Sequence, residues 1–401
     1  MGGRFALFLS ILSCLLSIPL PASRPLPGAT ESPIRPEPIP ESFFGMHVIL
    51  DDWPTVSFGD IRSSGVSWRK LEPSRGKFDW SPLDRQVSRA LAHGKKFYYS
   101  TGGVPKWWAG TSHIQDFDDF VAALATRYKG KIEAYELWNE PDQDEAIVQG
   151  SMSDIVLLTQ HMHDDIRRID PAALIASPAV VRVSWMDGYW GAGGVRDVDV
   201  VALHGYPPHS SVAPEIIGPQ KASPMLSLMA KYGLSAKPLW DSEASWGDST
   251  YGIVDLEQQA GFVARFYLLH WSYGFTRYYW YSWDDNGDGP GGVGWGTLFN
   301  PTTKIPLPAA RAYQQVHNWM VGATMSTPCT MAPDSTWTCT LTRPDGYRAI
   351  AVWNSSTSKS YTPSGEYTQY LDLSGSNHPV HGPVSIGYNP ILLSNSAAPA
   401  N

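Results

Sequence analysis

The chain has 401 residues, enough for one large and one small domain, and its 43% hydrophobic content can fill a substantial core. Only 17% of the residues are charged, whereas there are 17 Trp, 36 Gly and 33 Pro residues, a composition that excludes an extended helical or disordered protein and is typical of loop-rich secreted enzymes. The formal net charge of −8 argues against nucleic acid as a partner.

The N-terminus has the pattern of a secretory signal peptide. Arg4 precedes the apolar stretch Phe5–Leu20, and Pro21-Ala22 leads into a polar segment, so cleavage is expected near Ala22 or Ser23. A membrane anchor is the alternative, because the apolar stretch is close to the lower length limit of a spanning helix. We expect residues 1–22 to be removed, leaving a secreted protein, extracellular or periplasmic, without a membrane contact.

After the signal peptide, residues 23–41 contain six prolines and little that could pack, so they are predicted to form a linker. From residue 42 onward, short apolar strand-like runs alternate with stretches of helical periodicity. The eight runs are Phe43–Ile49, Val66–Arg69, Lys96–Thr101, Ile132–Trp138, Leu174–Ser177, Val198–His204, Pro238–Glu243 and Tyr278–Trp283. The helical stretches are Leu83–His93, Ile114–Tyr128, Asp154–Ile169, Ser223–Tyr232, Leu256–Tyr273 and Pro308–Met320. This alternation predicts an α/β fold, a (β/α)8 TIM barrel, over residues 42–322.

The composition changes again in residues 323–401, where Thr, Ser, Pro and Tyr dominate. The segments Trp337–Leu341, Arg348–Trp353 and Thr368–Leu373 show short β alternation with turn residues between them, which predicts a small all-β, sandwich-like domain. Cys329 and Cys339 are the two cysteines that remain after signal cleavage. In an oxidising compartment we expect them to form a disulfide.

Two glutamates end apolar runs about a hundred residues apart. Glu140 follows Trp138-Asn139 and Glu243 follows Trp240-Asp241-Ser242. Because the carboxyl ends of barrel strands meet at one face, both side chains can project toward one ligand.

The alternation of side chains along a strand predicts what surrounds these glutamates. It places Glu136 and Trp138 on the face of Glu140, and Asp241 on the face of Glu243. A buried carboxylate at Glu136 requires a cation. Arg69, at the end of the second run, is the expected partner.

These motifs resemble those of glycoside hydrolase clan A. Tyr-Glu-Leu-Trp-Asn-Glu-Pro (135–141) is similar to the acid/base motif of the clan, and Leu-Trp-Asp-Ser-Glu (239–243) is similar to its nucleophile strand. His204-Gly205-Tyr206 resembles the His-x-Tyr of the clan, whose tyrosine bonds to the nucleophile. Arg69 matches its strand-two arginine and Trp283 its strand-eight tryptophan. Residues 68–80 and the small β-domain look most like family 39, with families 5 and 51 as relatives.

The resemblance implies a retaining mechanism with two catalytic residues. Glu140 would be protonated near neutral pH by burial beside a negative charge, so that it can donate a proton to the leaving oxygen. Glu243 would be ionised and would attack the anomeric carbon, with hydrogen bonds from Tyr206 and Arg69. Asn139 would hold the sugar 2-hydroxyl.

Tryptophans at predicted strand ends are candidates for stacking on a sugar ring. Because Trp is also a common core residue, some of them are expected only to pack in the interior. Trp283 is the strongest candidate for sugar contact. The full set is Trp107, Trp108, Trp246, Trp283 and Trp295.

Other motifs indicate no cofactor and no metal centre. The Gly-rich segment 287–292 spells a dinucleotide fingerprint, but no helical pattern follows it and its acidic residue would repel a pyrophosphate. Asp284 begins a calcium-loop spacing, but Trp295 stands where the closing Glu is needed, so calcium is only an open alternative. His161 and His163 lie two apart on a predicted helix and face different directions.

The sequence therefore predicts a secreted retaining glycoside hydrolase that cleaves O-glycosidic bonds of a polysaccharide or oligosaccharide. Aromatic residues spread over several loops favour an extended cleft and internal cleavage. The alternatives are an exo-acting glycosidase, a transglycosylase or an inactive carbohydrate-binding barrel. A nucleotide-dependent oxidoreductase is disfavoured, because the first βα turn lacks the fingerprint. A monomer is expected.

Overall fold

The computed structural model describes residues 36–143, 151–208, 213–246, 255–285 and 296–396, all within one structural unit. The predicted signal peptide, most of the linker, Trp295 and the 287–292 segment lie outside the described residues. Among the residues that are described, no helix is both long and apolar enough to span a membrane.

Eight parallel strands form the central sheet. They are β1 (Phe44–His47), β2 (Ile61–Arg62), β3 (Phe97–Ser100), β4 (Ala134–Glu136), β5 (Leu174–Ala176), β6 (Val201–Leu203), β7 (Leu239–Ala244) and β8 (Phe275–Trp280). The strand order runs from β5 through β1 and β8 to β6, and a parallel bridge between Ala176 and Val200 joins its two ends. The sheet is therefore closed, and the predicted TIM barrel is confirmed.

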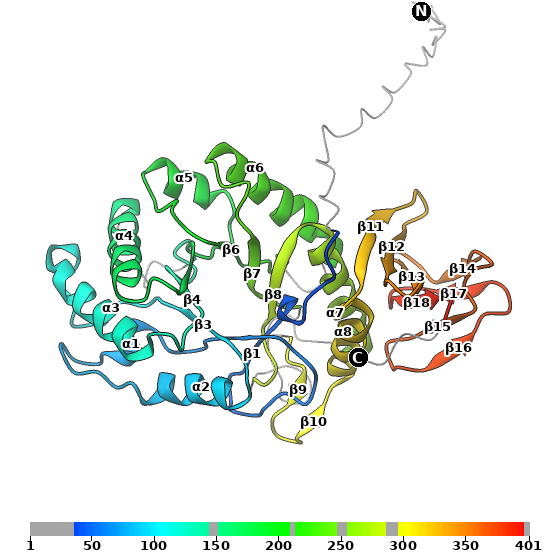
Figure 1. Ribbon diagram of the computed structural model, residues 1–401, viewed down its shortest axis with the longest axis horizontal. Helices are drawn as coiled ribbons and strands as arrows, with labels where there is room; N and C mark the ends of the chain where they lie inside the picture. The colour runs from blue at the N-terminus through cyan, green and yellow to red at the C-terminus, as the bar shows by residue number, and fades with distance from the viewer. Residues whose placement is uncertain (1–35, 144–150, 209–212, 247–254, 286–295, 397–401) are drawn as a thin grey trace, which may run out of the picture. The chain divides into compact units, whose positions relative to one another are not determined.

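Helices follow the strands and cover the outside of the barrel (Figure 1). They are α2 (Ser81–Ala92), α3 (Ile114–Tyr128), α4 (Met152–Ile169), α5 (Trp185–Gly191), α6 (Ser223–Lys231), α7 (Leu256–Ser272) and α8 (Pro308–Met320). The amphipathic pattern located six of these to within two residues at either end. The remaining one, α5, is short and lies between β5 and β6, where no helical stretch was predicted.

The predicted second strand, Val66–Arg69, is wrong. The strand is Ile61–Arg62, which pairs with β1 through Met46 and with β3 through Phe97. The segment Trp68–Leu71 is instead a single helical turn, α1. Its apolar residues suggested a buried strand. Trp68 is indeed buried, but against the aromatic rings of α3 on the outside of the barrel.

The end of the predicted linker packs on the barrel. Ile39 is buried, its amide donates to the carbonyl of Ala323 at 2.9 Å, and it forms a bridge with Val321. A 3-10 turn, η1 (Glu41–Phe43), then leads into β1. Ile39 thus attaches the described part of this segment, residues 36–41, to the barrel.

The C-terminal β-domain has two antiparallel sheets, which agrees with the sandwich-like prediction. The larger sheet consists, in spatial order, of β11 (Thr324–Met331), β12 (Thr336–Thr342), β13 (Arg348–Asn354), β18 (Ile391–Ser394), β15 (Gln369–Leu371) and β16 (Asn377–Pro379). The smaller sheet pairs β14 (Lys359–Tyr361) with β17 (Val384–Ile386). Val352, Leu393 and Ile386 belong to the apolar cluster that joins the two sheets. A short hairpin of β9 (Phe299–Asn300) and β10 (Ile305–Pro306) precedes α8.

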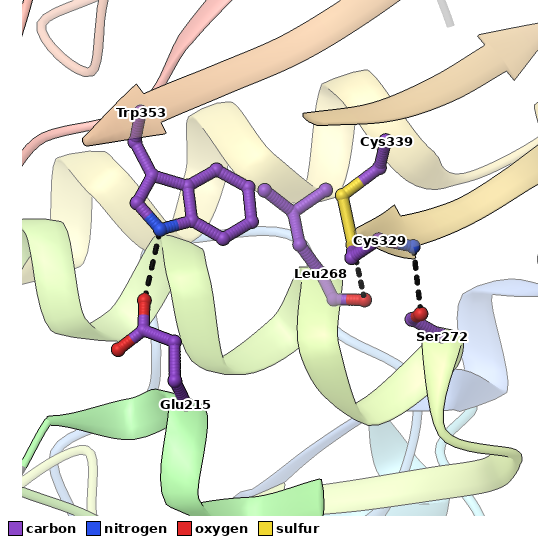
Figure 2. The surroundings of a disulfide bond; sticks show 6 residues. All are labelled: Glu215, Leu268, Ser272, Cys329, Cys339 and Trp353. Atoms are coloured by element: carbon purple, nitrogen blue, oxygen red, sulfur yellow. Dashed lines mark hydrogen bonds between the residues drawn. A yellow bond between two sulfur atoms is a disulfide. The ribbon is translucent and has the colours of Figure 1, made fainter. Parts of the chain in front are cut away.

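The other face of the larger sheet is attached to the barrel beside α7 (Figure 2). The predicted disulfide between Cys329 and Cys339 is present, and the Cys329 amide donates to the Ser272 hydroxyl at 2.8 Å. Trp353 of β13 donates its indole N–H to Glu215, in the segment after β6, at 2.8 Å. The β-domain therefore contacts both a barrel helix and a loop at the carboxyl end of a barrel strand.

Candidate active site

Arg62, at the end of β2, lies at the centre of the site. One guanidinium nitrogen donates to Glu136 at 2.6 Å and to the Asn139 side-chain oxygen at 2.8 Å, and the other donates to Glu243 at 2.6 Å. Arg62 is almost completely buried, so these charge-assisted hydrogen bonds act with little screening by water. Burial opposes its charge, but the two carboxylates outweigh burial and raise its pKa.

The prediction that Arg69 has this role is wrong. Arg69 lies on α1, its side chain is exposed, and its Nε donates to the carbonyl of Val104 at 2.8 Å. The expectation that a buried Glu136 needs a cation is confirmed, with Arg62 as the cation. Sequence periodicity could not locate Arg62, because a strand of two residues is too short to show an alternating pattern.

Glu136, the last residue of β4, is completely buried inside the barrel. Tyr98 donates to its Oε2 at 2.6 Å and Ser100 donates to its Oε1 at 2.5 Å. Burial favours the neutral form, but the charges of Arg62 and His204 and these hydrogen bonds prevail and lower the pKa of Glu136. The lowered pKa favours the charged form of Glu136, which pairs with Arg62 and helps to hold it in place.

Glu140 lies beyond the end of its strand. Strand β4 ends at Glu136, and Glu140 has a positive φ of 43°, so Asn139 and Glu140 both reach the barrel mouth. The predicted face for Trp138 is wrong for the same reason: its ring packs against Phe117 of α3, outside the barrel. Alternation of side chains holds only while the chain remains extended.

The Glu140 carboxylate forms a 2.6 Å contact with Nδ1 of His204, which follows β6. Burial would raise the pKa of Glu140, but the hydrogen bond and charge of His204, with the charges of Arg62 and Lys221, lower it. The expectation from the sequence that Glu140 has a raised pKa is therefore not met. Burial would lower the pKa of His204, yet the charges of Glu243 and Glu140 raise it. Glu140 and His204 therefore form an ion pair.

Glu243 is held through both of its oxygens. Tyr206 donates to Oε1 at 3.0 Å, as predicted, and Arg62 donates to Oε2. One carboxylate oxygen of Glu140, one ring nitrogen of His204 and one carboxylate oxygen of Glu243 all lie within 4.8 Å of one another. Such a group can hold a metal ion, but both oxygens of Glu243 are already used by Tyr206 and Arg62. The two glutamates therefore face each other across a short gap.

The predicted common face of Asp241 and Glu243 is wrong. Asp241 is buried on the outside of the barrel, where it contacts His270 of α7. The pairing of β7 with β8 has an irregularity between Asp241 and Ala244. This break in register turns Glu243 to the inside although Asp241, two residues earlier, points out.

Lys221 supports the loops around the site and was not recognised in the sequence. It lies in a short π-helical segment, η4 (Gly218–Ala222), and donates to the carbonyls of Val181 at 2.5 Å and His204 at 3.2 Å. Asp142 accepts the amide of Arg182 at 2.6 Å and so joins the loop after Glu140 to the same segment. These contacts connect the loops after three different strands.

A cleft of about 560 Å³ opens beside Glu243. Its walls contain Arg62, Asn139 and Glu243, together with His47, Tyr281 and small residues of the loops after β2 and β3. Burial and the charge of Arg62 hold the pKa of His47 well below its usual value, so the ring is neutral. His47 and Tyr281 lie within predicted strand runs, but their role could not be distinguished from core packing.

The structure contradicts the tryptophan predictions for Trp283 and Trp246. Trp283 is fully buried and stacks on Phe299, and Trp246 is buried against Phe262. Trp108 is partly exposed, but its ring packs on Trp68 and does not line the cleft. Trp107 likewise packs on Trp68, edge to face. Among the described cleft residues, the aromatic rings are those of Tyr281 and His47, and none is a tryptophan.

The calcium-loop spacing has another explanation at its first position. Asp284 is buried, and its carboxylate accepts the backbone amides of Ile49, Leu50 and Asp52 at 2.6, 3.1 and 2.8 Å. His161 contacts Asp118 at 2.7 Å, and His163 contacts Asp164 at 2.8 Å, so the two histidines face different neighbours as predicted.

Comparisons with solved structures agree with this fold. A family 39 glycoside hydrolase from Bacteroides cellulosilyticus WH2 has a TM-score of 0.71 at 16% identity, over 89% of this chain and 82% of that chain. A family 39 beta-xylosidase from Caulobacter crescentus has a TM-score of 0.63 at 16% identity, over 90% and 97% of the two chains. The fold is that of TIM-barrel glycoside hydrolases. The expected barrel with a C-terminal β-domain is therefore a fold that this chain shares with family 39 glycoside hydrolases.

Sequence comparisons cover shorter segments. A glycoside hydrolase family 42 model, described as beta-galactosidase, matches residues 56–132. This range includes Arg62 but neither Glu140 nor Glu243. Endo-1,4-beta-xylanase 1 of Gibberella zeae is 27% identical over 105 residues, which are 24% of this chain and 30% of that protein. The match thus spans less than a third of the curated relative.

Proposed function

We propose that the chain is a retaining O-glycoside hydrolase, with Glu243 as nucleophile and Glu140 as acid/base. The observation that carries the proposal is the position of the two carboxylates, whose oxygens approach within 4.8 Å from the ends of β4 and β7. Retaining glycosidases keep their carboxyl groups about 5–5.5 Å apart, whereas inverting enzymes need room for a water molecule between carboxylate and sugar.

The contacts of each glutamate support different roles. Tyr206 and Arg62 hold the two oxygens of Glu243, which orients the carboxylate for attack on the anomeric carbon. The sugar–oxygen bond breaks as the Glu243–carbon bond forms, and the proton that the Glu140–His204 pair shares passes from His204 through Glu140 to the leaving oxygen. Glu140 then removes a proton from water, which attacks the same carbon and releases Glu243. His204, in contact with Glu140, holds the acid/base in position and stabilises its charged form.

Asn139 is proposed to bind the sugar 2-hydroxyl. Its side-chain oxygen accepts from Arg62, which leaves the amide N–H₂ group to face the cleft that Asn139 lines. A hydrogen bond to the 2-hydroxyl strengthens as positive charge develops on the sugar.

The substrate we propose is a xylose-based polysaccharide cleaved internally. The support is that one relative is named an endo-1,4-beta-xylanase and that a structure of the same fold is named a beta-xylosidase. The alternative is exo-action on short xylosides or galactosides, since the matched family model is described as beta-galactosidase. We further propose that the protein is secreted, on its N-terminal pattern, and monomeric, as a Caulobacter crescentus beta-xylosidase is named.

A substrate screen with product sizing tests this proposal. Purified mature protein is incubated with xylan, other polysaccharides, and aryl xylosides and galactosides, and early products are sized. Xylo-oligosaccharides of several lengths at early times support internal cleavage of xylan. Monosaccharide as the sole early product would support the exo alternative, and binding without turnover on every substrate would leave a carbohydrate-binding barrel.

A further inference from the structure

A buried ionisable pair lies directly behind the nucleophile and takes no part in the chemistry described above. Oδ2 of Asp241 is 2.8 Å from Nε2 of His270, and neither side chain is exposed. Nδ1 of His270 is 2.7 Å from the carbonyl oxygen of Phe266, which can only accept a hydrogen bond. The His270 ring also stacks on Tyr278, with ring centroids 4.1 Å apart. The ring is therefore fixed on both edges and one face.

The other oxygen of Asp241 binds two backbone amides of the active site. Oδ1 accepts the amide of Gly205 at 3.0 Å and the amide of Glu243 at 3.3 Å. Gly205 lies between His204 and Tyr206, which contact Glu140 and Glu243 respectively. One carboxylate oxygen thus connects the backbone of the nucleophile to the backbone of the segment that carries its hydrogen-bond donor.

The space around Gly205 requires this close approach. A Cβ atom at position 205 would lie 1.9 Å from Oδ2 of Asp241 and 2.9 Å from Cδ1 of Ile217. Real Cβ atoms do not come this close to another atom, so a side chain at this position would displace the Asp241 carboxylate. The glycine of the His-Gly-Tyr segment is present because Asp241 occupies the space beside it.

We propose that Asp241 and His270 are positioning residues that hold Glu243 and the Tyr206 segment as one rigid unit. The inference rests on the proposed function, because it concerns how the nucleophile of that reaction is oriented. A displacement of about 1 Å in a reacting group can cost about a hundredfold in rate. The pair prevents such displacement from the outer side of the barrel, where no substrate reaches.

Two substitutions at Asp241 separate positioning by hydrogen bonds from other effects. Asp241→Asn keeps an oxygen that accepts both amides, and its N–H₂ group can donate to Nε2 of His270. Asp241→Ala removes all three contacts. We expect Asp241→Ala to lower kcat about a hundredfold with KM changed less than about threefold, and Asp241→Asn to remain within about tenfold of the wild type. His270→Phe keeps the stacked ring and should lower kcat about tenfold.

Asp170→Ala is the matched control. Asp170 is also buried and also accepts a backbone amide, that of Gly130 at 3.0 Å, but it lies at the end of α4, before β5. The control should lose stability and keep its kcat. Equal losses in the two Asp241 variants, or a folded Asp241→Ala protein with wild-type kcat, would overturn the proposal.

Hydrogen–deuterium exchange provides a readout that needs no enzymatic activity. In Asp241→Ala, peptides that contain Gly205 and Glu243 should both exchange faster, while the rest of the barrel does not change. Faster exchange throughout the barrel, as in a merely destabilised protein, would contradict the inference. A wild-type protein inactive on all glycosides would refute the proposed function, yet the exchange experiment would still decide whether Asp241 couples the two segments.

Discussion

Arg62 and Glu243 are joined by a 2.6 Å hydrogen bond between a guanidinium nitrogen and Oε2, deep in the mouth of the barrel. The same guanidinium contacts Glu136, which is completely buried. Glu243, the proposed nucleophile, is therefore the partly exposed end of a carboxylate–guanidinium–carboxylate arrangement whose other two members are buried. Its orientation depends on a residue that takes no part in bond making.

Replacing Arg62 should affect both stability and turnover. In Arg62→Met, Glu136 and Glu243 lose their shared cation, and breaking a buried pair costs about 3–5 kcal/mol of unfolding free energy. Arg69→Met is the control, because this exposed arginine lies on α1, and the expected loss is below about 1 kcal/mol. Urea unfolding and kcat on an aryl xyloside measure both effects. Equal behaviour of the two variants would contradict the assigned network.

The two glutamates should respond differently to truncation. Glu243→Ala should abolish turnover on every substrate, since no covalent intermediate can form. Glu140→Ala should still form the intermediate from substrates with good leaving groups, and added azide should restore its breakdown. Proton NMR of the first-formed product should show retained anomeric configuration. An inverted product would rule out Glu243 as a nucleophile.

The pH dependence should report the charge of Lys221. Acid catalysis requires a proton on the Glu140–His204 pair, so kcat/KM falls as pH rises through the pKa of that pair. Lys221 lowers the pKa of Glu140, and removing its charge in Lys221→Met should raise that pKa. The descending limb of the pH profile is expected to move to higher pH by roughly half a unit.

Lys231→Met serves as the control for this pH shift. Lys231 is exposed and pairs with Asp187 at 2.6 Å on the outside of the barrel. Its pH profile should match that of the wild type. A limb that moves to lower pH in Lys221→Met would show that Lys221 does not act on Glu140 through its charge.

The disulfide should stabilise the β-domain where it meets the barrel. Cys329 and Cys339 are separated by 10 positions, and a loop of this length contributes about 3 kcal/mol in the chain-entropy model. The double variant Cys329→Ala/Cys339→Ala should lose that amount of unfolding free energy, and the reduced wild-type protein should be destabilised by the same amount. Thiol counting on unfolded, unreduced mature protein is expected to find none, and two free thiols would refute the bridge.

The two glutamates and the His204–Tyr206 segment could be predicted from sequence because each is part of a contiguous motif. Glu140 lies shortly after the end of β4 and Glu243 is the second-last residue of β7, so a motif at the carboxyl end of each strand is enough to place both at the barrel mouth. The disulfide was also predictable, because Cys329 and Cys339 are the two cysteines outside the predicted signal peptide. In each case the information lies within a few neighbouring residues or in a simple count.

Only the tertiary structure decided which side chains complete the site. Arg62 was missed in favour of Arg69 because strand β2 has two residues, and burial of Trp68 against α3 gives the same apolar signal as burial in a strand. Likewise β8 ends at Trp280, so alternation no longer holds at Trp283, and Tyr281 lines the cleft instead. Periodicity records that a side chain is buried, whereas the register of pairing and the end of each strand determine against what it is buried.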